Sequence, residues 1–399
     1  MADSPTASVP IVDGHCHPPL RPPGPRDALE LLGLFAESRE PAAIAQAAET
    51  LYVRRALRDL AALHACAPTL PAILAARQAL APGELMRRCV ERAGVVALLL
   101  DDGYRAEDCY PVGDLAELLA PACQAQPVLR LEPLLERLLA ASPSFAALEE
   151  GFDDALADPR RRGIVALKSI VAYRSGLALG PPDRRAAAAA YAAVKRRPFR
   201  VGARQGAPVA AVPPRLVEKP LLDYFLARAC RLAARDELPL QLHTGFGDAD
   251  LDLLQANPLL LRPALEAETL AGVPLVLLHC YPYLREAAYL ASLYGAVYVD
   301  VSLTLPLVGP GGQRAVEEVL ELAPTSKVLY GSDAAGLAES IWLGALAIRR
   351  ALDGALGNWL AAGALLPAEA TRIAEQVLWR NAVALYGLPI ATGPVRHDR

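Results

Sequence analysis

Two histidines one residue apart end an apolar run near the start of the chain, in the segment 11–17 (IVDGHCH). A strand places alternate side chains on one face, so His15 and His17 would point the same way, with Asp13 deeper on that face. Neutral imidazole is a good ligand for zinc, iron, nickel or manganese. Because a lone His-x-His pair also occurs in ordinary turns, a metal site requires further ligands from the rest of the chain.

Four further polar residues interrupt or end apolar runs elsewhere: Lys168, His243, His279 and Asp333. Histidine and aspartate supply the neutral or anionic donors that a divalent ion requires, and such a set leaves a coordination position for water. His64 lies within a helical pattern and His397 lies close to the C-terminus, so we expect neither of them to bind the ion.

The elements that would position these residues are eight apolar segments separated by helical sequence. Their ranges are 11–17, 94–103, 127–132, 163–171, 238–243, 273–279, 296–302 and 327–333. Near-continuous apolar runs are typical of parallel strands buried on both faces, and strands that alternate with helices predict a parallel sheet. Eight such units predict a closed (β/α)₈ barrel of the TIM type, in which the strand ends meet at one mouth. A doubly wound sheet would instead place a glycine-rich turn after the first strand, where this chain has HCHPP.

We expect a single barrel domain over residues 11–390, with a helical insertion after the first strand at about 27–92. Residues 1–10 and 391–399 read as flexible tails. A polar excursion at about 174–220 follows the fourth strand. Because the insertion and the excursion both follow strands, we expect them to wall the barrel mouth and to set specificity.

The composition favours a protein that acts on a small molecule. Hydrophobic residues make up 53% of the 399 residues, which is enough for a large core. A net charge of -4, from 40 basic and 44 acidic residues, lacks the excess of positive charge that is typical of proteins that bind nucleic acid or an anionic membrane. The seven cysteines form no Cys-x-x-Cys pair, which argues against a structural zinc knot. No segment reads as a signal peptide or a membrane span, so we expect a cytoplasmic protein; whether it forms a homo-oligomer stays open.

As an ordered set, the strand-end motifs resemble those of the amidohydrolase superfamily of metal-dependent barrel hydrolases. The motifs are VDGHCH (12–17), Lys168, LHTG (242–245), LHC (278–280) and GSD (331–333). The helical insertion, the DDG at 101–103 and the run KSIVAYRSG at 168–176 are most similar to the amidohydrolase-related branch found elsewhere fused to a glutamine-synthetase-like domain. The resemblance covers roughly residues 11–390.

The resemblance implies that His15, His17 and Asp333 hold a first divalent ion, zinc or manganese. Asp333 would also accept a proton from the water that this ion activates. A chain of this family would carry one or two such ions.

The resemblance implies two roles for His243 and His279. In a two-metal site they hold the second ion, and a carboxylated Lys168 bridges both ions. In a one-metal site His243 joins the first ion and His279 polarises the substrate carbonyl. Apolar neighbours of Lys168 would depress its pKa and favour the carbamate. Two other roles stay open: a cation that binds a substrate carboxylate, and a purely structural lysine.

Residues beyond the fourth strand could orient the substrate. Arg174 could bind a carboxylate with two parallel hydrogen bonds, and Tyr173 could contribute its hydroxyl. Alternatively, Arg174 is an ordinary surface arginine. Further charged residues at the same rim are Asp101, Asp102, Arg130 and Glu132. These residues would either fix the imidazole tautomers or cap the barrel mouth through salt bridges. For Asp13 we expect buried hydrogen bonding rather than ligation.

Together these features predict a metal-dependent hydrolase that cleaves a C–N (amide) bond of a small substrate bearing a carboxylate. A metal-activated water would attack, with Asp333 as the general base. Two alternatives use the same residues. One is a non-hydrolytic decarboxylase or isomerase, and the other is a catalytically silent metal-binding partner module.

Overall fold

A computed structural model describes residues 4–22, 24–197, 200–202, 210–212, 215–270 and 272–390 of the chain. Eight strands of this described part form one sheet, in the order β1-β2-β3-β4-β7-β8-β9-β10. They are β1 (Ile11–Cys16), β2 (Val95–Asp101), β3 (Gln124–Arg130), β4 (Ala166–Ser169), β7 (Leu240–Thr244), β8 (Leu275–His279), β9 (Val297–Asp300) and β10 (Val328–Leu329). Every pair of neighbours in this order is parallel.

The two edges of the sheet meet and nearly close it into a barrel. Gly14 of β1 donates its N–H to the carbonyl of Tyr330, just after β10, at 2.9 Å. The N–H of Asp333 donates to the carbonyl of His15, also at 2.9 Å. The (β/α)₈ barrel predicted from the alternating segments is therefore confirmed.

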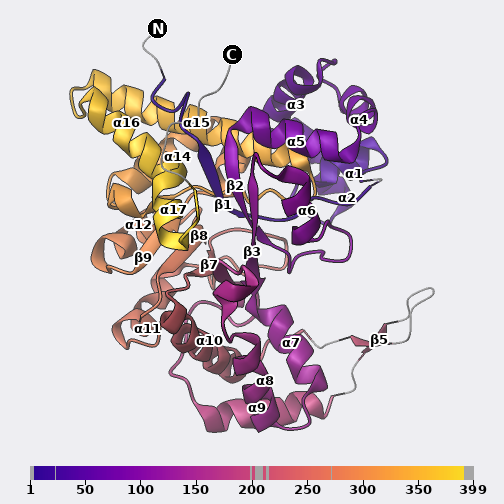
Figure 1. The fold of residues 1–399 in the computed structure, drawn as a ribbon, viewed down its shortest axis with the longest axis vertical. Coiled ribbons are helices and arrows are strands. Elements are labelled where there is room, and N and C mark those ends of the chain that lie inside the picture. The colour runs from indigo at the N-terminus through magenta and orange to yellow at the C-terminus, as the bar shows by residue number, and fades with distance from the viewer. Residues whose placement is uncertain are drawn as a thin grey trace.

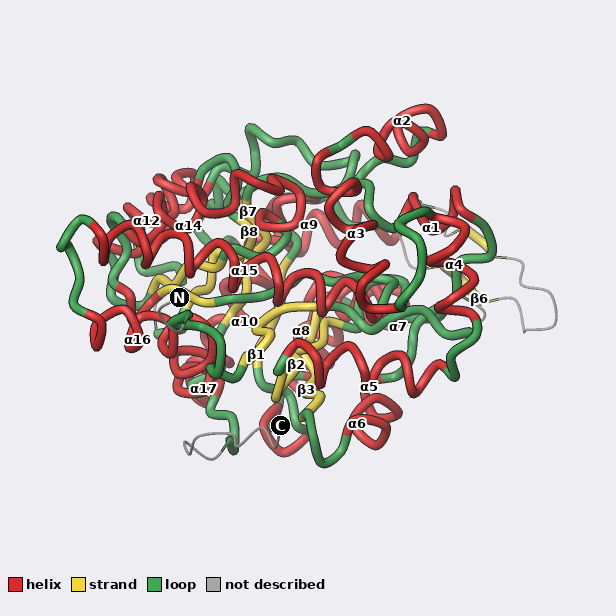
Figure 2. The backbone as a smooth tube through the Cα atoms, turned by 90° about the horizontal axis from the view of Figure 1, so that it is seen from above, coloured by secondary structure: helices red, strands yellow, loops and turns green. Residues whose placement is uncertain are grey.

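Helices follow the strands around the barrel. After β2 and β3 come α6 (Val112–Leu119), α7 (Leu131–Ala141) and α8 (Phe145–Ala155). After β4, β7, β8 and β9 come α9 (Arg184–Lys195), α10 (Lys219–Ala233), α11 (Arg262–Glu266), α12 (Leu284–Leu293), α13 (Thr304–Val308) and α14 (Gly312–Leu320). After β10 the chain ends in α15 (Ala338–Ala361), α16 (Pro367–Glu375) and α17 (Asn381–Tyr386). Figure 2 shows α15 passing in front of the strands near β1.

The segment between β1 and β2 is helical. It contains α1 (Ala28–Gly33), α2 (Pro41–Gln46), α3 (Leu51–His64), α4 (Leu70–Gln78) and α5 (Pro82–Ala93). Helices α3 and α5 pack against α15, and the indigo and purple helices gather beside it in Figure 1. The end of α1 and the loop after it reach the barrel mouth, where Glu37 and Arg39 line the main cavity.

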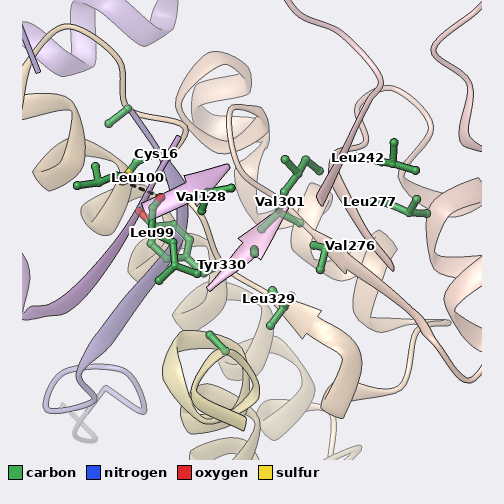
Figure 3. Packing of buried hydrophobic residues seen from close by; sticks show 14 of the residues in the cluster. Cys16, Leu99, Leu100, Val128, Leu242, Val276, Leu277, Val301, Leu329 and Tyr330 are labelled. Carbon is green, nitrogen blue, oxygen red and sulfur yellow. Dashed lines mark hydrogen bonds between the residues drawn. The ribbon is translucent and has the colours of Figure 1, made fainter. Parts of the chain in front are cut away.

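Apolar side chains fill both faces of the sheet. Every residue of β1, β7 and β8 is buried, as parallel strands covered by helices require. Figure 3 shows this packing, with Leu99, Val128 and Leu277 among the residues drawn. The Cys16 thiol donates to the carbonyl of Leu99 at 3.6 Å. This cysteine is a free, buried residue of the core.

Several strands differ in length from the sequence prediction. Strand β3 spans Gln124–Arg130, so Glu132 belongs to α7 rather than to the third strand. Strand β10 pairs with β9 over two residues only, because the residues after it turn toward β1, where Ser332 donates its N–H to Asp13 Oδ1 at 2.8 Å. The polar excursion also holds an antiparallel pair, β5 (Arg200–Gly202) and β6 (Ala210–Val212), that the sequence does not predict.

The start of the chain corrects the prediction of a flexible tail over residues 1–10. Thr6 is buried, and Asp353 of α15 accepts hydrogen bonds from its N–H at 3.1 Å and its hydroxyl at 2.8 Å. Arg349 of the same helix donates to the carbonyl of Val9 at 2.8 Å. These bonds fix residues 4–10 because they satisfy both side chains and backbone. Residues 1–3, and the second predicted tail at 391–399 with His397, lie outside the described residues.

Within the described ranges, no helix is both long and apolar enough to cross a lipid bilayer.

Candidate metal centre and active site

Two histidines of β1 and one carboxylate after β10 meet at the carboxyl ends of the strands. His15 Nε2 lies 3.2 Å and His17 Nε2 lies 3.4 Å from Asp333 Oδ1. His15 is fully buried, and His17 and Asp333 are nearly so. The structure thus brings together the three residues predicted to hold the first ion.

Hydrogen bonds at the outer ring nitrogens decide which nitrogen of each histidine carries the proton. His15 Nδ1 lies 2.9 Å from Gln241 Oε1. Since the Gln241 amide nitrogen donates to the carbonyl of Gly14 at 2.7 Å, its oxygen faces His15 and accepts the Nδ1 proton. His17 Nδ1 lies 2.8 Å from the carbonyl of Asp101, which can only accept. Both histidines therefore direct an Nε2 lone pair at Asp333.

The charge states make this arrangement suited to a cation. Burial, followed by the nearby Lys168 ammonium, lowers the pKa of His15 to about 4, so its imidazole is neutral at pH 7. Burial raises the pKa of Asp333, but electrostatic attraction to His279, whose protonated Nδ1 lies 3.9 Å from Oδ2, outweighs it and holds the pKa well below its usual range. Two lone pairs and a carboxylate then converge without a proton between them. A divalent ion satisfies such a donor set, so the residues fit a metal.

His243 and His279 lie side by side next to these ligands. Their ring centroids are 4.5 Å apart, and burial lowers the pKa of both well below the usual value. His279 Nδ1 lies 2.8 Å from the hydroxyl of Ser302, which itself donates to Asp300 at 2.6 Å, so the His279 nitrogen donates. His243 Nε2 is buried and has no hydrogen-bond partner among the described residues. Such an orphaned nitrogen is a further free donor for a metal.

Lys168 points into the same cluster from β4. Its Nζ lies 3.2 Å from His15 Nε2, and only 1% of the residue is exposed. Burial lowers the pKa of Lys168 to about 8, although Asp101 and Asp333 oppose the shift. A lower pKa leaves more neutral amine at pH 7, which is the form that reacts with carbon dioxide. The position serves either a carbamate or a cation directed at substrate.

Two site residues adopt a backbone conformation that is unfavourable for side chains with a Cβ atom. His279 has φ 68° and Asp333 has φ 52°. Each such residue costs about 1–3 kcal/mol unless its surroundings hold it. Asp300 holds the first turn by accepting from the N–H of His279 at 2.9 Å, and Asp13 holds the second through the Ser332 hydroxyl at 2.5 Å. Asp13 thus makes buried hydrogen bonds, as the sequence predicts.

A cavity of about 280 Å³ opens above these residues. The insertion contributes Glu37 and Arg39 to its wall, and the excursion contributes Arg215, which confirms that both segments line the mouth. Its cationic lining residues are Arg39, Arg105, Arg130, Lys168, Arg174 and Arg215. Its acidic lining residues are Glu37, Asp248, Asp250 and Asp333. Two of these cations are already paired with acids behind the wall, Arg130 with Asp101 and Arg174 with Glu136, so the lining is mixed in charge.

Tyr173 and Arg174 both line this cavity. The Tyr173 hydroxyl accepts the N–H of Asp248 at 3.0 Å, which leaves its own proton for another acceptor. A side chain at Gly247 would place its Cβ only 1.9 Å from that hydroxyl, so this position requires glycine. Arg174 is buried rather than on the surface; it pairs with Glu136 at 3.0 Å, and its Nε has no partner among the described residues.

The charged residues predicted at the rim divide between the two proposed roles. Asp101 forms a buried ion pair with Arg130 at 2.5 Å, and only its backbone carbonyl orients a histidine. Glu132 accepts from Ser169 at 2.6 Å and caps the turn after β4. Asp102 is exposed and does not line the cavity. His64 lies far from these residues in the fold, 3.4 Å from Glu339 at the start of α15.

An ion-pair network joins three mouth segments, and sequence reasoning does not identify it. Arg39 lies 3.9 Å from Asp248 and 3.7 Å from Asp250, and Asp250 pairs with Arg215 at 2.8 Å. Glu37 shares a hydrogen bond with Asp248; burial, with the charges of Asp333 and Asp248, raises the pKa of Glu37. No sequence motif marks these loop residues, because only the fold brings them together.

Comparisons with known proteins agree with this site. A family model described as amidohydrolase matches residues 160–388. Protein fluG of Emericella nidulans is 30% identical over 412 residues, which is 95% of this chain and 46% of that protein. The chain therefore spans about half the length of this curated relative.

Solved structures also resemble the chain. A Lactobacillus casei protein assigned as a metal-dependent hydrolase has a TM-score of 0.83 and 30% identity, over 96% of each chain. The uronate isomerase of Thermotoga maritima has a TM-score of 0.66 and 14% identity over 96% of this chain and 95% of its own, a likeness of fold alone. These matches confirm the superfamily expected from the strand-end motifs: the chain belongs to the amidohydrolase family.

Proposed function

We propose that this protein is a metal-dependent hydrolase that cleaves the C–N bond of a small amide bearing a carboxylate. The observation that carries the proposal is the convergence of two neutral imidazole lone pairs, from His15 and His17, on one oxygen of Asp333. The family of the chain supports a hydrolytic enzyme.

His15, His17 and Asp333 would hold a divalent ion, and His243 or His279 would complete its donor set or hold a second ion. We propose zinc, with manganese as the alternative, because both accept imidazole nitrogen and carboxylate oxygen. Such an ion, when bound, lowers the pKa of a coordinated water and polarises a carbonyl.

Asp333 is the group that would move the proton. Its Oδ1 faces His15 and His17, whereas Oδ2 lies 3.9 Å from His279 Nδ1. The carboxylate, held ionised by its surroundings, accepts a proton as water adds to the amide carbonyl. It then returns that proton to the nitrogen that leaves, and the C–N bond breaks.

The cavity suggests the class of substrate. A volume of about 280 Å³ lies at the lower end of the ~300–1,000 Å³ of ordinary ligand pockets, so the substrate would be small. A guanidinium nitrogen of Arg174 that has no acceptor among the described residues favours a carboxylate. We propose that the Tyr173 hydroxyl and the unpartnered Nε of Arg174 receive that group.

The experiment is the substitution Asp333→Asn, measured for metal content and turnover on carboxylate-bearing amides. We expect the variant to keep part of its metal, while kcat falls about a hundredfold or more, the scale of a lost general base. Asp102→Asn is the matched control, because that carboxylate is exposed at the same rim and should leave both values unchanged.

Product analysis separates hydrolysis from the other reactions of such barrels. The panel should include a uronate, since an isomerase of this fold acts on one by its name and a uronate also carries a carboxylate. Release of an amine from an amide supports the proposal, whereas rearrangement without bond cleavage, or loss of carbon dioxide, contradicts it. A metal-loaded protein inactive on the whole panel would support a silent binding module. Cytoplasmic location and the absence of nucleic-acid or membrane partners stay predictions, and a homo-oligomer stays an open possibility.

A further inference from the structure

A second cavity, of about 250 Å³, lies away from the barrel mouth. It is enclosed by α3 of the insertion, the segment from α13 to the start of α14, and α15, which pack against one another. Its apolar wall includes Leu305, Leu343 and Ala351, all of them buried. Its volume is below the ~300–1,000 Å³ that larger ligands require, so an occupant would be small.

Two guanidinium groups in this cavity share one carboxylate. Arg350 of α15 binds Asp59 of α3 with both terminal nitrogens, at 2.5 and 2.8 Å. Arg55, one turn before Asp59, places its Nε 3.9 Å from the same carboxylate and makes no hydrogen bond to any residue that the structure describes. Two positive charges therefore share a single negative charge beside an apolar wall.

The surroundings of Arg55 would strengthen the binding of an anion. Its side chain is only 36% exposed, so water solvates the guanidinium incompletely. Burial, followed by the charge of Arg350, lowers the pKa of Arg55, because both disfavour the charged form of its side chain. A carboxylate between Arg55 and Arg350 would relieve the repulsion and supply the missing acceptors.

The lining of the second cavity is linked to that of the main cavity through a third, smaller one. The smaller cavity, of about 60 Å³, shares Glu37 and Asp333 with the main cavity, and shares Tyr52 and Pro306 with the second one. Tyr52 thus stands between the two larger cavities.

We propose that this second cavity is a binding site for a small organic carboxylate, held by Arg55 and Arg350 with its apolar body against the wall formed by α13 and α15. The site is distinct from the metal centre and does not depend on the reaction catalysed there. The closest chemical probe is benzoate, which has one carboxylate and a compact apolar ring.

The experiment measures benzoate binding to the metal-loaded protein by equilibrium dialysis. Arg55→Gln should weaken one class of site about tenfold or more, the scale of one charge-assisted hydrogen bond. Arg58→Gln is the matched control, since Arg58 is exposed on the same helix and does not line the cavity. Because Arg55 makes no hydrogen bond to a described residue, its substitution should leave the melting temperature nearly unchanged.

The number of classes of benzoate site distinguishes the proposed site from the active site. If benzoate also binds at the metal centre, the wild type shows two classes of site and only one of them weakens in Arg55→Gln; if it does not, the single class weakens. A crystal soaked with 4-bromobenzoate should show bromine anomalous density between α3 and α15. Equal binding by the wild type, Arg55→Gln and Arg58→Gln, with no bromine in this cavity, would overturn the proposal.

Discussion

Gln241 gives His15 the orientation that a metal ligand requires. Its side-chain oxygen accepts from His15 Nδ1 at 2.9 Å, while its nitrogen donates to Gly14 at 2.7 Å and to the Tyr386 hydroxyl at 2.9 Å. The fully buried amide is therefore fixed at three points. Partners of this kind fix the tautomer of a ligating histidine and commonly change metal affinity when they are removed.

Replacing Gln241 should weaken metal binding without removing a ligand. We expect Gln241→Leu to raise the Kd for zinc about 10–100-fold, because His15 loses the acceptor that fixes its tautomer and ring. Gln241→Glu keeps an acceptor oxygen and should recover part of the affinity. Tyr386→Phe removes one of the three contacts of Gln241 but keeps the acceptor of His15, and it should have the smaller effect. Competition against a chelating dye gives each Kd, and equal values for Gln241→Leu and Tyr386→Phe would argue against this role.

The sequence indicates the candidate ligands more readily than the residues that orient them. His15, His17 and Asp333 could be predicted because each ends an apolar strand, and strand ends meet at the barrel mouth. Gln241 carries one available signal: it is a polar residue on the same face of a buried strand as His243. Ser302 carries none, since its contact with His279 depends on a turn that the sequence does not specify.

At the scale of elements, one buried carboxylate joins the insertion to the barrel. Glu339 lies in the first turn of α15, and it accepts from Arg77 of α4 at 2.8 Å and lies 3.4 Å from His64 of α3. Burial raises the pKa of Glu339, but the contacts with His64 and Arg77 outweigh it and lower the pKa to about 2. The insertion is thus held in place by an ionised group in the interior.

Glu339→Gln should destabilise the fold in a way that depends on pH. The substitution leaves the Arg77 cation buried without its counterion, a change that typically costs about 3–5 kcal/mol. Since the folded pKa of Glu339 is depressed, its contribution is present above about pH 4.5 and is lost as the pH falls toward 2. Urea unfolding at pH 7 and at pH 3 should show the gap between variant and wild type narrowing in acid. Glu321→Gln, an exposed acid, is the control, and a gap independent of pH would contradict the assignment.

Element boundaries follow from local pattern only where the pattern is strong. The long apolar segments of β2, β7 and β8 are easily found, because both faces of these strands are buried. β10 is short because its continuation bonds to β1 and Asp13 instead of β9, which no local pattern encodes. The pair β5 and β6 lies within a polar excursion, where periodicity carries no signal.

At the scale of the whole molecule, the candidate metal site lies across the junction between the first and the last strand of the barrel. β1 and β10 are the two edges of the sheet, and they are joined through scattered bonds such as those of Gly14 and Asp333 rather than a regular ladder. His15 and His17 stand on one side of this junction and Asp333 on the other. An ion held by all three would therefore tie the first strand to the last.

Metal should consequently stabilise the whole domain. A free ion at a hundred times its Kd adds about 2.7 kcal/mol to the free energy of unfolding. With an unfolding entropy of about 2.1 cal/mol/K per residue, a chain of 399 residues should gain about 3 °C in Tm.

Differential scanning calorimetry with zinc, and then with excess chelator, measures this shift. The double substitution of His15→Ala and His17→Ala is expected to lower the starting Tm and to abolish the response to zinc, because it removes the ligands on the β1 side. Substitution of His64→Ala changes a histidine that is remote from the centre and should keep the response. A shift that survives in the double variant would place the stabilising ion elsewhere, and the barrel edges would then be joined by their hydrogen bonds alone.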